Sequence, residues 1–303
     1  KIFAAACIVA LLSVGVYSFF APFTSDNQVA TIEKNRSNFE KDTRLVIAGE
    51  RTIPLEEGDD VLYGGGEATI SSINQQDERY AVDVNDSKVE YNELIVPKGR
   101  RASHLVLEDG SKVWVNSGST FRFPTTFEKN KREVYVDGEI YIEIAKDAER
   151  PFFVKTSEMS VRALGTRFNV MAYPEEMEAA VTLVHGKVGV QTDHRQQILQ
   201  PDEQYVYQTT TRRGTVRKVD VSQYVDWKDG ILNFDSMPLE ELTRRLGRWY
   251  DVDFFFVAEE LKTLKYSGAF KKYNDIRYVL NIIEEITNVQ FVLNERTIVV
   301  NRK

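Results

Sequence analysis

The sequence has little cysteine, little histidine and no excess of basic residues. Its 303 residues include one cysteine, Cys7, which excludes a disulfide framework or a thiolate metal site within the chain. The three histidines, His104, His185 and His194, lack the spacing that gathers three or four zinc ligands. We therefore expect no bound metal, and the fold must be stabilised by packing.

The net charge of the chain indicates which kinds of partner it can bind. Lys and Arg number 39 against 46 Asp and Glu, giving a formal charge of −7. Nucleic-acid binding needs clustered basic residues, so we expect no direct contact with DNA or RNA. The glycine run at residues 64–66 lacks the Lys-Ser/Thr of a P-loop and the spaced glycines of a dinucleotide site, so it is interpreted as a flexible loop. No cofactor is expected.

The N-terminal segment is the longest apolar run. Residues 2–23 carry no charge, and about 20 such residues span a bilayer core of about 30 Å as a helix. We predict a transmembrane helix at residues 1–23. The alternative is a secretory signal peptide, whose apolar part is usually about 7–15 residues long and ends at a small-x-small site. This run is longer and ends in aromatic residues, which suit a membrane interface.

The flanking charges do not fix the orientation of this helix. Only Lys1 precedes it, whereas Lys34, Arg36 and Lys41 follow. The chain begins with Lys rather than Met, so we expect a preceding segment that carries the deciding charges. Residues 24–44 are polar without a sustained apolar period, which predicts a linker.

Short alternating segments begin after the linker. They predict a β lead-in at residues 45–95 and an all-β domain at residues 96–220, either a sandwich or solenoid-like. Asp109-Gly110 and Asp137-Gly138 are hairpin signals, because type I′ turns need two residues that tolerate positive φ. The predicted fold class is thus mainly β.

The last part of the chain, residues 225–303, shows a repeat with an offset of 37 residues. In each copy four positions form one helix stripe and two lie in the following strand. The paired positions are Leu239 and Ile276, Leu242 and Val279, Leu246 and Ile283, Trp249 and Ile286, Val252 and Val289, and Phe254 and Phe291. With a strand before each helix, the pattern predicts a small α+β domain of two β-α-β repeats.

Four blocks between Val96 and Val190 carry a family resemblance. In order they are VPKGRRASHLVLEDGSKVWVNSGSTFRFP, REVYVDGEIYIEIAKDAERPFFV, VRALGTRFNVMAY and VTLVHGKVGV. Together they resemble the FecR family of anti-sigma factors. The C-terminal repeat resembles the small domain at the N-termini of secretins and TonB-dependent receptors, in the variant found in Bacteroidetes FecR-type proteins.

The resemblance implies a signalling role across two membranes. A TonB-dependent receptor in the outer membrane would contact the chain through its periplasmic signalling domain. The chain would in turn control an extracytoplasmic-function sigma factor through an N-terminal part that precedes this sequence. The protein would be single-pass in the inner membrane, with residues after 23 in the periplasm, and would not be an enzyme.

Two other classes stay open. One is a membrane-tethered carbohydrate-binding or carbohydrate-cleaving β protein, which would need aromatic residues and carboxylates gathered in one cleft. The other is a structural piece of a secretin-like assembly.

The resemblance also draws attention to Gly165 and Thr166. Some FecR-type proteins break a Gly-Thr bond by attack of the Thr hydroxyl on the preceding carbonyl, which gives an ester that water opens. This single-turnover step needs a strained peptide, and glycine permits such conformations. The alternative is that Gly165 is a bulge or close-approach glycine and Thr166 a strand residue.

An acidic run contains Glu139, Glu143, Asp147 and Glu149. Paired carboxylates can act in glycoside cleavage. Strand alternation instead places Glu139, Tyr141 and Glu143 on one face, which we interpret as a solvated face.

Aromatic residues cluster in the C-terminal part. Trp227, Trp249, Phe254 and Phe256 are expected in the core. Alternation then exposes Phe255, which makes it the candidate partner-binding residue, because exposed aromatics and sheet edges are used in docking.

Overall fold

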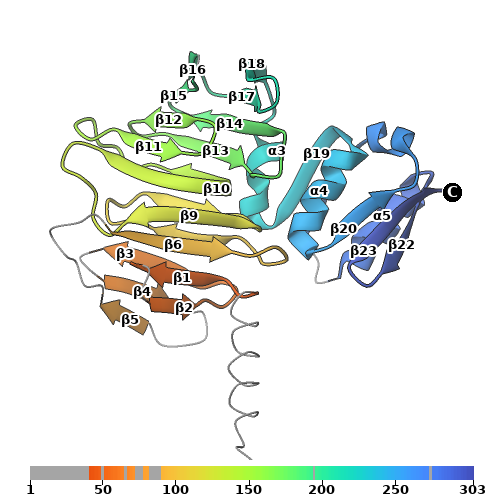
Figure 1. Ribbon diagram of the computed structural model, residues 1–303, viewed down its shortest axis with the longest axis horizontal. Helices are drawn as coiled ribbons and strands as arrows, with labels where there is room; N and C mark the ends of the chain where they lie inside the picture. Colours follow the sequence, from red (N-terminus) through yellow and green to blue (C-terminus); the bar gives the residue numbers. More distant parts are fainter. Residues whose placement is uncertain are drawn as a thin grey trace, which may run out of the picture. The chain divides into compact units, whose positions relative to one another are not determined.

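Figure 1 shows the computed structural model of the chain, which describes residues 41–48, 51–64, 67–71, 78–81, 90–193, 195–272 and 275–303. The predicted transmembrane helix at residues 1–23 and the linker up to residue 40 lie outside the described residues, as do Gly65, Gly66 and His194. Within the described part of the chain, no helix is long and apolar enough to cross a membrane. Residues Lys41–Lys303 form one compact unit.

The first part of this unit, called the β domain (residues 44–218), contains two sheets. The first has the strand order β2 (Arg51–Pro54), β1 (Arg44–Ile47), β6 (Tyr91–Val96), β9 (Ser119–Pro124), the first half of β10 (Arg132–Glu143), β11 (Phe152–Lys155), β12 (Ser160–Ala163), β15 (Val188–Gln191) and β16 (Gln196–Leu199). The second has the order β5 (Glu78–Ala81), β4 (Glu67–Ser71), β3 (Asp60–Gly64), β7 (Ser103–Val106), β8 (Lys112–Val115), the second half of β10, β13 (Arg167–Ala172), β14 (Glu178–His185), β17 (Glu203–Gln208) and β18 (Arg213–Lys218). The mainly β fold class is confirmed.

One hydrophobic core lies between the two sheets. It contains Leu45 and Val61 from the lead-in strands together with Phe121, Phe168 and Val181 from later strands, all fully buried. Alternate residues of most strands contribute to it, as expected where one sheet face is apolar. The lead-in therefore packs in the same core as the strands that follow.

The Asp137-Gly138 pair corrects one prediction. It is not a hairpin turn but lies inside β10, where that strand leaves the first sheet and joins the second. Gly138 has φ of 115°, and a Cβ there would lie 2.7 Å from the Cα of Ser119, so the position requires glycine. Asp109-Gly110 lies in the turn between β7 and β8, with a φ of 80° at Gly110.

The chain then passes through a connector into the C-terminal domain (residues 231–303). The connector consists of α3 (Ser222–Val225) and the 3₁₀ turn η1 (Asp226–Asp229). The C-terminal elements are β19 (Ile231–Pro238), α4 (Leu239–Tyr250), β20 (Asp253–Phe256), the 3₁₀ turn η2 (Glu259–Thr263), β21 (Lys265–Lys271), α5 (Ile276–Ile286), β22 (Val289–Asn294) and β23 (Thr297–Arg302).

The two halves of the C-terminal domain interleave. Helices α4 and α5 begin at Leu239 and Ile276, the first pair of the 37-residue repeat. The first strands of the two halves, β19 and β21, pair with each other. The second strands, β20 and β22, lie on either side of β23, parallel and antiparallel to it respectively.

A second hydrophobic cluster joins the two domains. It combines Tyr141 of β10 with Trp227 of the connector and with Leu246 and Trp249 of α4. The expected solvated face of β10 is therefore wrong at two positions, because Glu139 is 9% and Tyr141 is 3% exposed. Alternation assigned these side chains to one face correctly, but it could not show that the connector and C-terminal domain cover that face.

Candidate interaction surface

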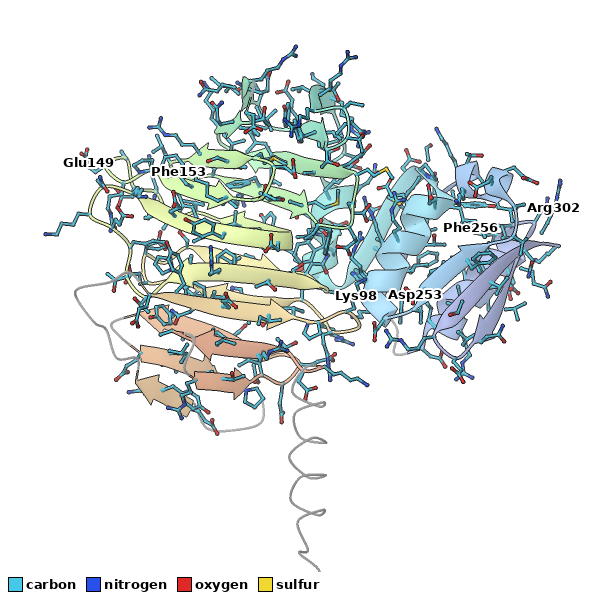
Figure 2. The ribbon with its side chains drawn as sticks, viewed as in Figure 1. Lys98, Glu149, Phe153, Asp253, Phe256 and Arg302 are labelled. Carbon is cyan, nitrogen blue, oxygen red and sulfur yellow. The ribbon has the colours of Figure 1, made fainter. Side chains whose placement is uncertain are left out.

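Strand β20 lies at the edge of the three-stranded sheet of the C-terminal domain. Its sequence is Asp-Phe-Phe-Phe, and alternation along it separates the three aromatic side chains. Phe254 and Phe256 are half-buried against the second cluster, whereas Phe255 is 61% exposed. Figure 2 labels Asp253 and Phe256 at the two ends of this strand.

The backbone of β20 is satisfied on one side by β23. The N–H of Asp253 donates to the carbonyl of Arg296 at 2.8 Å, and the N–H of Val257 donates to that of Val300 at 3.2 Å. In a parallel ladder alternate residues bond to the same neighbour, so the amides of Phe254 and Phe256 point the other way. Among the described residues no strand pairs with that edge.

The open face of the same sheet carries an apolar row. Phe255 lies opposite Val299, and Val299 lies opposite Val292 on the far strand. Val292 is 40% exposed, and Val257, just beyond the end of β20, is 54% exposed. The helices cover only the other face, where Val300 is fully buried. An exposed aromatic thus stands beside an open strand edge.

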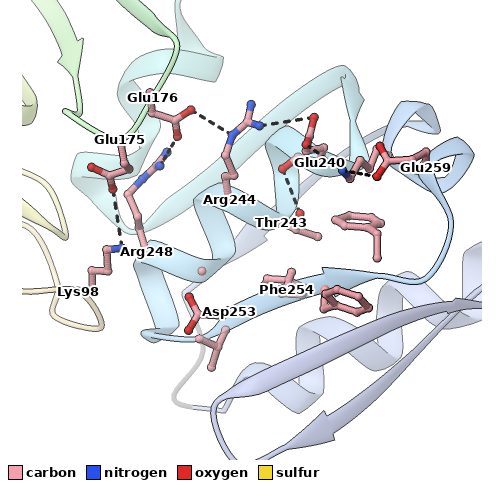
Figure 3. Close-up of a pocket in the computed structure, with 15 residues that line it drawn as sticks. Lys98, Glu175, Glu176, Glu240, Thr243, Arg244, Arg248, Asp253, Phe254 and Glu259 are labelled. Atoms are coloured by element: carbon pink, nitrogen blue, oxygen red, sulfur yellow. Dashed lines mark hydrogen bonds and ion pairs between the residues drawn. The ribbon is translucent and has the colours of Figure 1, made fainter.

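A groove of about 410 Å³ runs along β20 and helix α4 (Figure 3). Residues Val252 to Phe256 form one wall, and Thr243 and Gly247 belong to the α4 wall. A Cβ at Gly247 would lie 2.8 Å from the carbonyl oxygen of Val252, so glycine permits the close approach of the two walls.

Charged side chains of the groove are arranged in pairs (Figure 3). Lys98 lies 3.7 Å from Glu175, Arg244 lies 3.1 Å from Glu176 and 3.6 Å from Glu240, and Lys262 lies 2.8 Å from Glu259. The groove does bring aromatics and carboxylates together, as a carbohydrate-cleaving protein would require. However, each of these four glutamates is already engaged in an ion pair with Lys or Arg.

Two loops of the β domain hold the end of α4. The turn after β13 supplies Glu176, which forms an ion pair with Arg248, and Tyr173, whose ring centroid is 4.1 Å from the same guanidinium. The N–H of Gly99 donates to the carbonyl of Arg248 at 2.8 Å. Burial raises the pKa of Tyr173, so its hydroxyl stays protonated and donates to the carbonyl of Ser117.

A buried polar chain continues this contact between the domains. Glu139 accepts hydrogen bonds from the amides of Asn116 at 2.8 Å and Asn169 at 2.9 Å. The Oδ1 atom of Asn169 accepts from the indole N–H of Trp227 at 3.1 Å. The sequence named Glu139 only as part of an acidic run and Trp227 only as a core aromatic, and it did not single out Asn116 or Asn169. Partners so far apart along the chain meet only when the sheet is assembled.

Gly165 and Thr166 lie in the β domain, in the break between β12 and β13. They are not part of the surface around Phe255. A Cβ at Gly165 would lie 3.2 Å from the Cα of Lys146, which makes it a close-approach glycine, and its φ is outside the left-handed region. Thr166 is 3% exposed, and its hydroxyl donates to the carbonyl of Lys187 at 3.2 Å. The Thr166 hydroxyl is thus engaged in an ordinary hydrogen bond to Lys187. The carbonyl that self-cleavage would attack is that of the preceding residue, Gly165.

The two histidines in the described part of the chain, His104 and His185, do not converge. His104 Nδ1 lies 2.9 Å from an oxygen of Asp60 on the neighbouring strand, and His185 is at the exposed end of β14. Within the described ranges, no group of three or more His, Cys, Asp or Glu could hold a metal ion.

These features define a protein built from a two-sheet β domain and a small α+β domain with an open sheet edge. Two crystal structures of a protein from Parabacteroides distasonis, assigned as an anti-sigma factor and solved at 1.65 and 2.50 Å, share this fold. Each has a TM-score of 0.65 and 28% identity, over 70% of this chain and 99% of that one. No curated protein matches the sequence.

Two segments match the models of a single family. Residues 94–189 match "FecR protein", and residues 231–300 match "FecR, C-terminal". The matches together span more than half of the chain and fall in the β domain and the C-terminal domain. The chain belongs to the FecR family, as its sequence blocks predicted.

Proposed function

We propose that this chain is the membrane and periplasmic part of an anti-sigma factor. It relays a signal from an outer-membrane TonB-dependent receptor to an extracytoplasmic-function sigma factor. Family membership supports this role, as does 28% identity along almost the whole of the Parabacteroides distasonis protein that is assigned as an anti-sigma factor. Membership also favours a regulatory binding protein over an enzyme.

In this proposal the chain is divided by the inner membrane. Residues 1–23 anchor it, and the residues after 23 lie in the periplasm, where they can meet the receptor's periplasmic signalling domain. The sigma factor is controlled on the cytoplasmic side. The alternative of a carbohydrate-active protein gains no support from the groove, because its glutamates are held by Lys and Arg.

The C-terminal domain makes the receptor contact. The single observation that carries this assignment is Phe255, 61% exposed on a strand whose outer edge has no partner strand among the described residues. A strand of the signalling domain can add to such an edge through main-chain hydrogen bonds, while an apolar side chain packs on the row formed by Phe255, Val299 and Val292.

Binding of the receptor's signalling domain tests this assignment directly. The full chain is titrated calorimetrically with the purified periplasmic signalling domain of each TonB-dependent receptor of the same organism. We expect one of them to bind with a Kd of roughly 1 μM, or about 8 kcal/mol, as suits a transient signalling contact. Absence of binding by every such domain would contradict the receptor assignment.

The regulatory role is tested separately in cells. Removal of the gene is expected to change transcription from the promoters of one extracytoplasmic-function sigma factor, and the change should require that sigma factor. If transcription is the same with and without the gene, under conditions where the receptor's nutrient is present and absent, the anti-sigma role is wrong.

A further inference from the structure

A second cavity, of about 230 Å³, lies between the β domain and the C-terminal domain. Ala102 and Ser117 line it from the β domain. Trp227 and Lys228 line it from the connector, and Trp249 and Lys272 from the C-terminal domain. The volume is below the roughly 300 Å³ at which pockets for drug-sized ligands begin, so it suits a small molecule.

The side chain of Lys272 lies half-buried in the wall of this cavity, without a carboxylate partner among the described residues. Its Nζ donates to the carbonyls of Gly99 at 3.2 Å and Arg100 at 2.8 Å, which uses two of its three N–H groups. Among the described residues no Asp or Glu forms an ion pair with it. Burial lowers the pKa of Lys272 to about 8, partly opposed by Glu57 and reinforced by Arg101 and Arg100. A buried charge without a counter-ion is costly.

The neighbouring cations already have carboxylate partners. Lys228 lies 2.5 Å from Asp229, and Arg101 lies 3.4 Å from Glu57. Arg100 does not line the cavity and forms an ion pair with Asp42. Within the described part of the chain, Lys272 is thus the cation of this cavity that still lacks an anion.

Apolar surface lies beside this charge. The Lys272 ammonium is 5.9 Å from the ring centroid of Trp249, and Trp227 forms another part of the wall. Both indoles are held in the second hydrophobic cluster, at 5% and 6% exposure. Charge pairing and apolar contact would then act together.

We propose that this cavity binds a small organic carboxylate whose anionic group pairs with Lys272 and whose apolar body packs against Trp227 and Trp249. Such a ligand contacts both domains at once. Its binding therefore stabilises the contact between the domains by mass action. The stabilisation grows with the logarithm of the ligand concentration once that concentration exceeds Kd. The inference does not depend on the receptor contact, because Phe255, Val299 and Val292 do not line this cavity.

Tryptophan fluorescence provides a direct test. The chain has three tryptophans: Trp227 and Trp249 line the cavity, and the ring centroid of Trp114 lies 5.9 Å from the Nζ of the lining residue Lys228. The full chain is titrated with benzoate and, in parallel, with benzamide, which has nearly the same shape but no charge. We expect saturable quenching by benzoate with a millimolar Kd, and at least tenfold weaker binding of benzamide.

Three variants separate the contribution of the Lys272 charge to binding from that of the cavity itself. Lys272→Met should weaken benzoate binding at least tenfold, whereas Lys228→Met should leave it within about twofold, because Lys228 is already paired with Asp229. Ala102→Phe should abolish binding by filling the cavity while keeping Lys272. Lack of saturation by benzoate, equal binding of benzamide, or unchanged binding by Ala102→Phe would each overturn the proposal, even if Lys272→Met did not fold.

Discussion

The carboxylate of Glu176 lies 2.5 Å from the guanidinium of Arg248, although the two residues are 72 positions apart in the sequence. Their side chains are only 11% and 9% exposed. Glu176 belongs to the turn between β13 and β14, and Arg248 belongs to α4, so this pair joins the β domain to the C-terminal domain. Glu176 also pairs with Arg244, one helical turn earlier.

We predict that Glu176→Ala destabilises the chain by about 3 kcal/mol, because removing one partner leaves the charge of Arg248 buried and unpaired. Glu175→Ala is the matched control. Glu175 pairs with Lys98, but both side chains are about half exposed, so its loss should cost at most about 0.5 kcal/mol. Urea unfolding measures both values. Equal effects of the two substitutions would contradict a buried, stabilising ion pair between Glu176 and Arg248.

The sequence contained most of the information on element order. Alternation such as that in Val134, Val136 and Ile140 follows from a sheet with one buried face. The 37-residue repeat located both long helices, because α4 and α5 bury the same stripe of positions. Exposure of Phe255 also followed from alternation, since Phe254 and Phe256 share the buried face.

What covers a face could not be predicted from the pattern along one strand. Tyr141 and Glu139 have the alternation of a solvated face, but residues about 90 positions later cover them. For the same reason, no local sequence pattern predicted the ion pair between Glu176 and Arg248. Nor did one predict that Lys272 has no carboxylate partner among the described residues. Asp137-Gly138 has the composition of a turn, and only the contact with Ser119 shows why glycine occurs inside a strand.

The candidate partner-binding residue gives a second prediction. Phe255→Ala should weaken binding of the receptor's signalling domain at least tenfold, because truncation removes the largest exposed apolar side chain of the β20 row. It should change the free energy of unfolding by no more than about 0.5 kcal/mol, since the side chain is mostly exposed. Calorimetric titration and urea unfolding give the two values.

Leu62→Ala is the control for this measurement. Leu62 is 45% exposed, but it lies on β3 of the β domain, so its truncation should leave the affinity unchanged. If Phe255→Ala bound as tightly as the unsubstituted chain, the contact would have to lie elsewhere on the protein.

A third prediction concerns the bond between Gly165 and Thr166. Self-cleavage would give a fragment beginning at Thr166, formed in the unsubstituted chain and in Thr166→Ser but absent in Thr166→Ala. Strands β12 and β13 on either side of the bond each pair with two neighbours, so both fragments should stay together under native conditions. Mass spectrometry after denaturation, compared with native size exclusion, checks this. An intact chain alone, in cells and after purification, would leave Gly165 as a close-approach glycine.

The last prediction follows from the burial of Lys272. Its pKa of about 8 in the folded chain lies below the ordinary value of 10.5, mainly because burial disfavours the ammonium. Between these two values the unfolded chain binds more protons than the folded chain. The free energy of unfolding should therefore rise with pH across this window, and Lys272 should contribute no slope below about pH 8.

We expect the contribution of Lys272 to reach about 1–3 kcal/mol by the upper end of the window, given about 1.4 kcal/mol for each unit of pKa difference. Other groups titrate in the same range, including the tyrosines, so the informative quantity is the difference between variants. Lys272→Met should remove this part of the slope, whereas Lys228→Met should keep it, because Lys228 is paired with Asp229. Urea unfolding of the three proteins from pH 7.5 to 10.5 measures the slopes. If all three slopes coincide, the ammonium of Lys272 is solvated in the folded chain, and its burial beside Gly99 and Arg100 does not destabilise the charge.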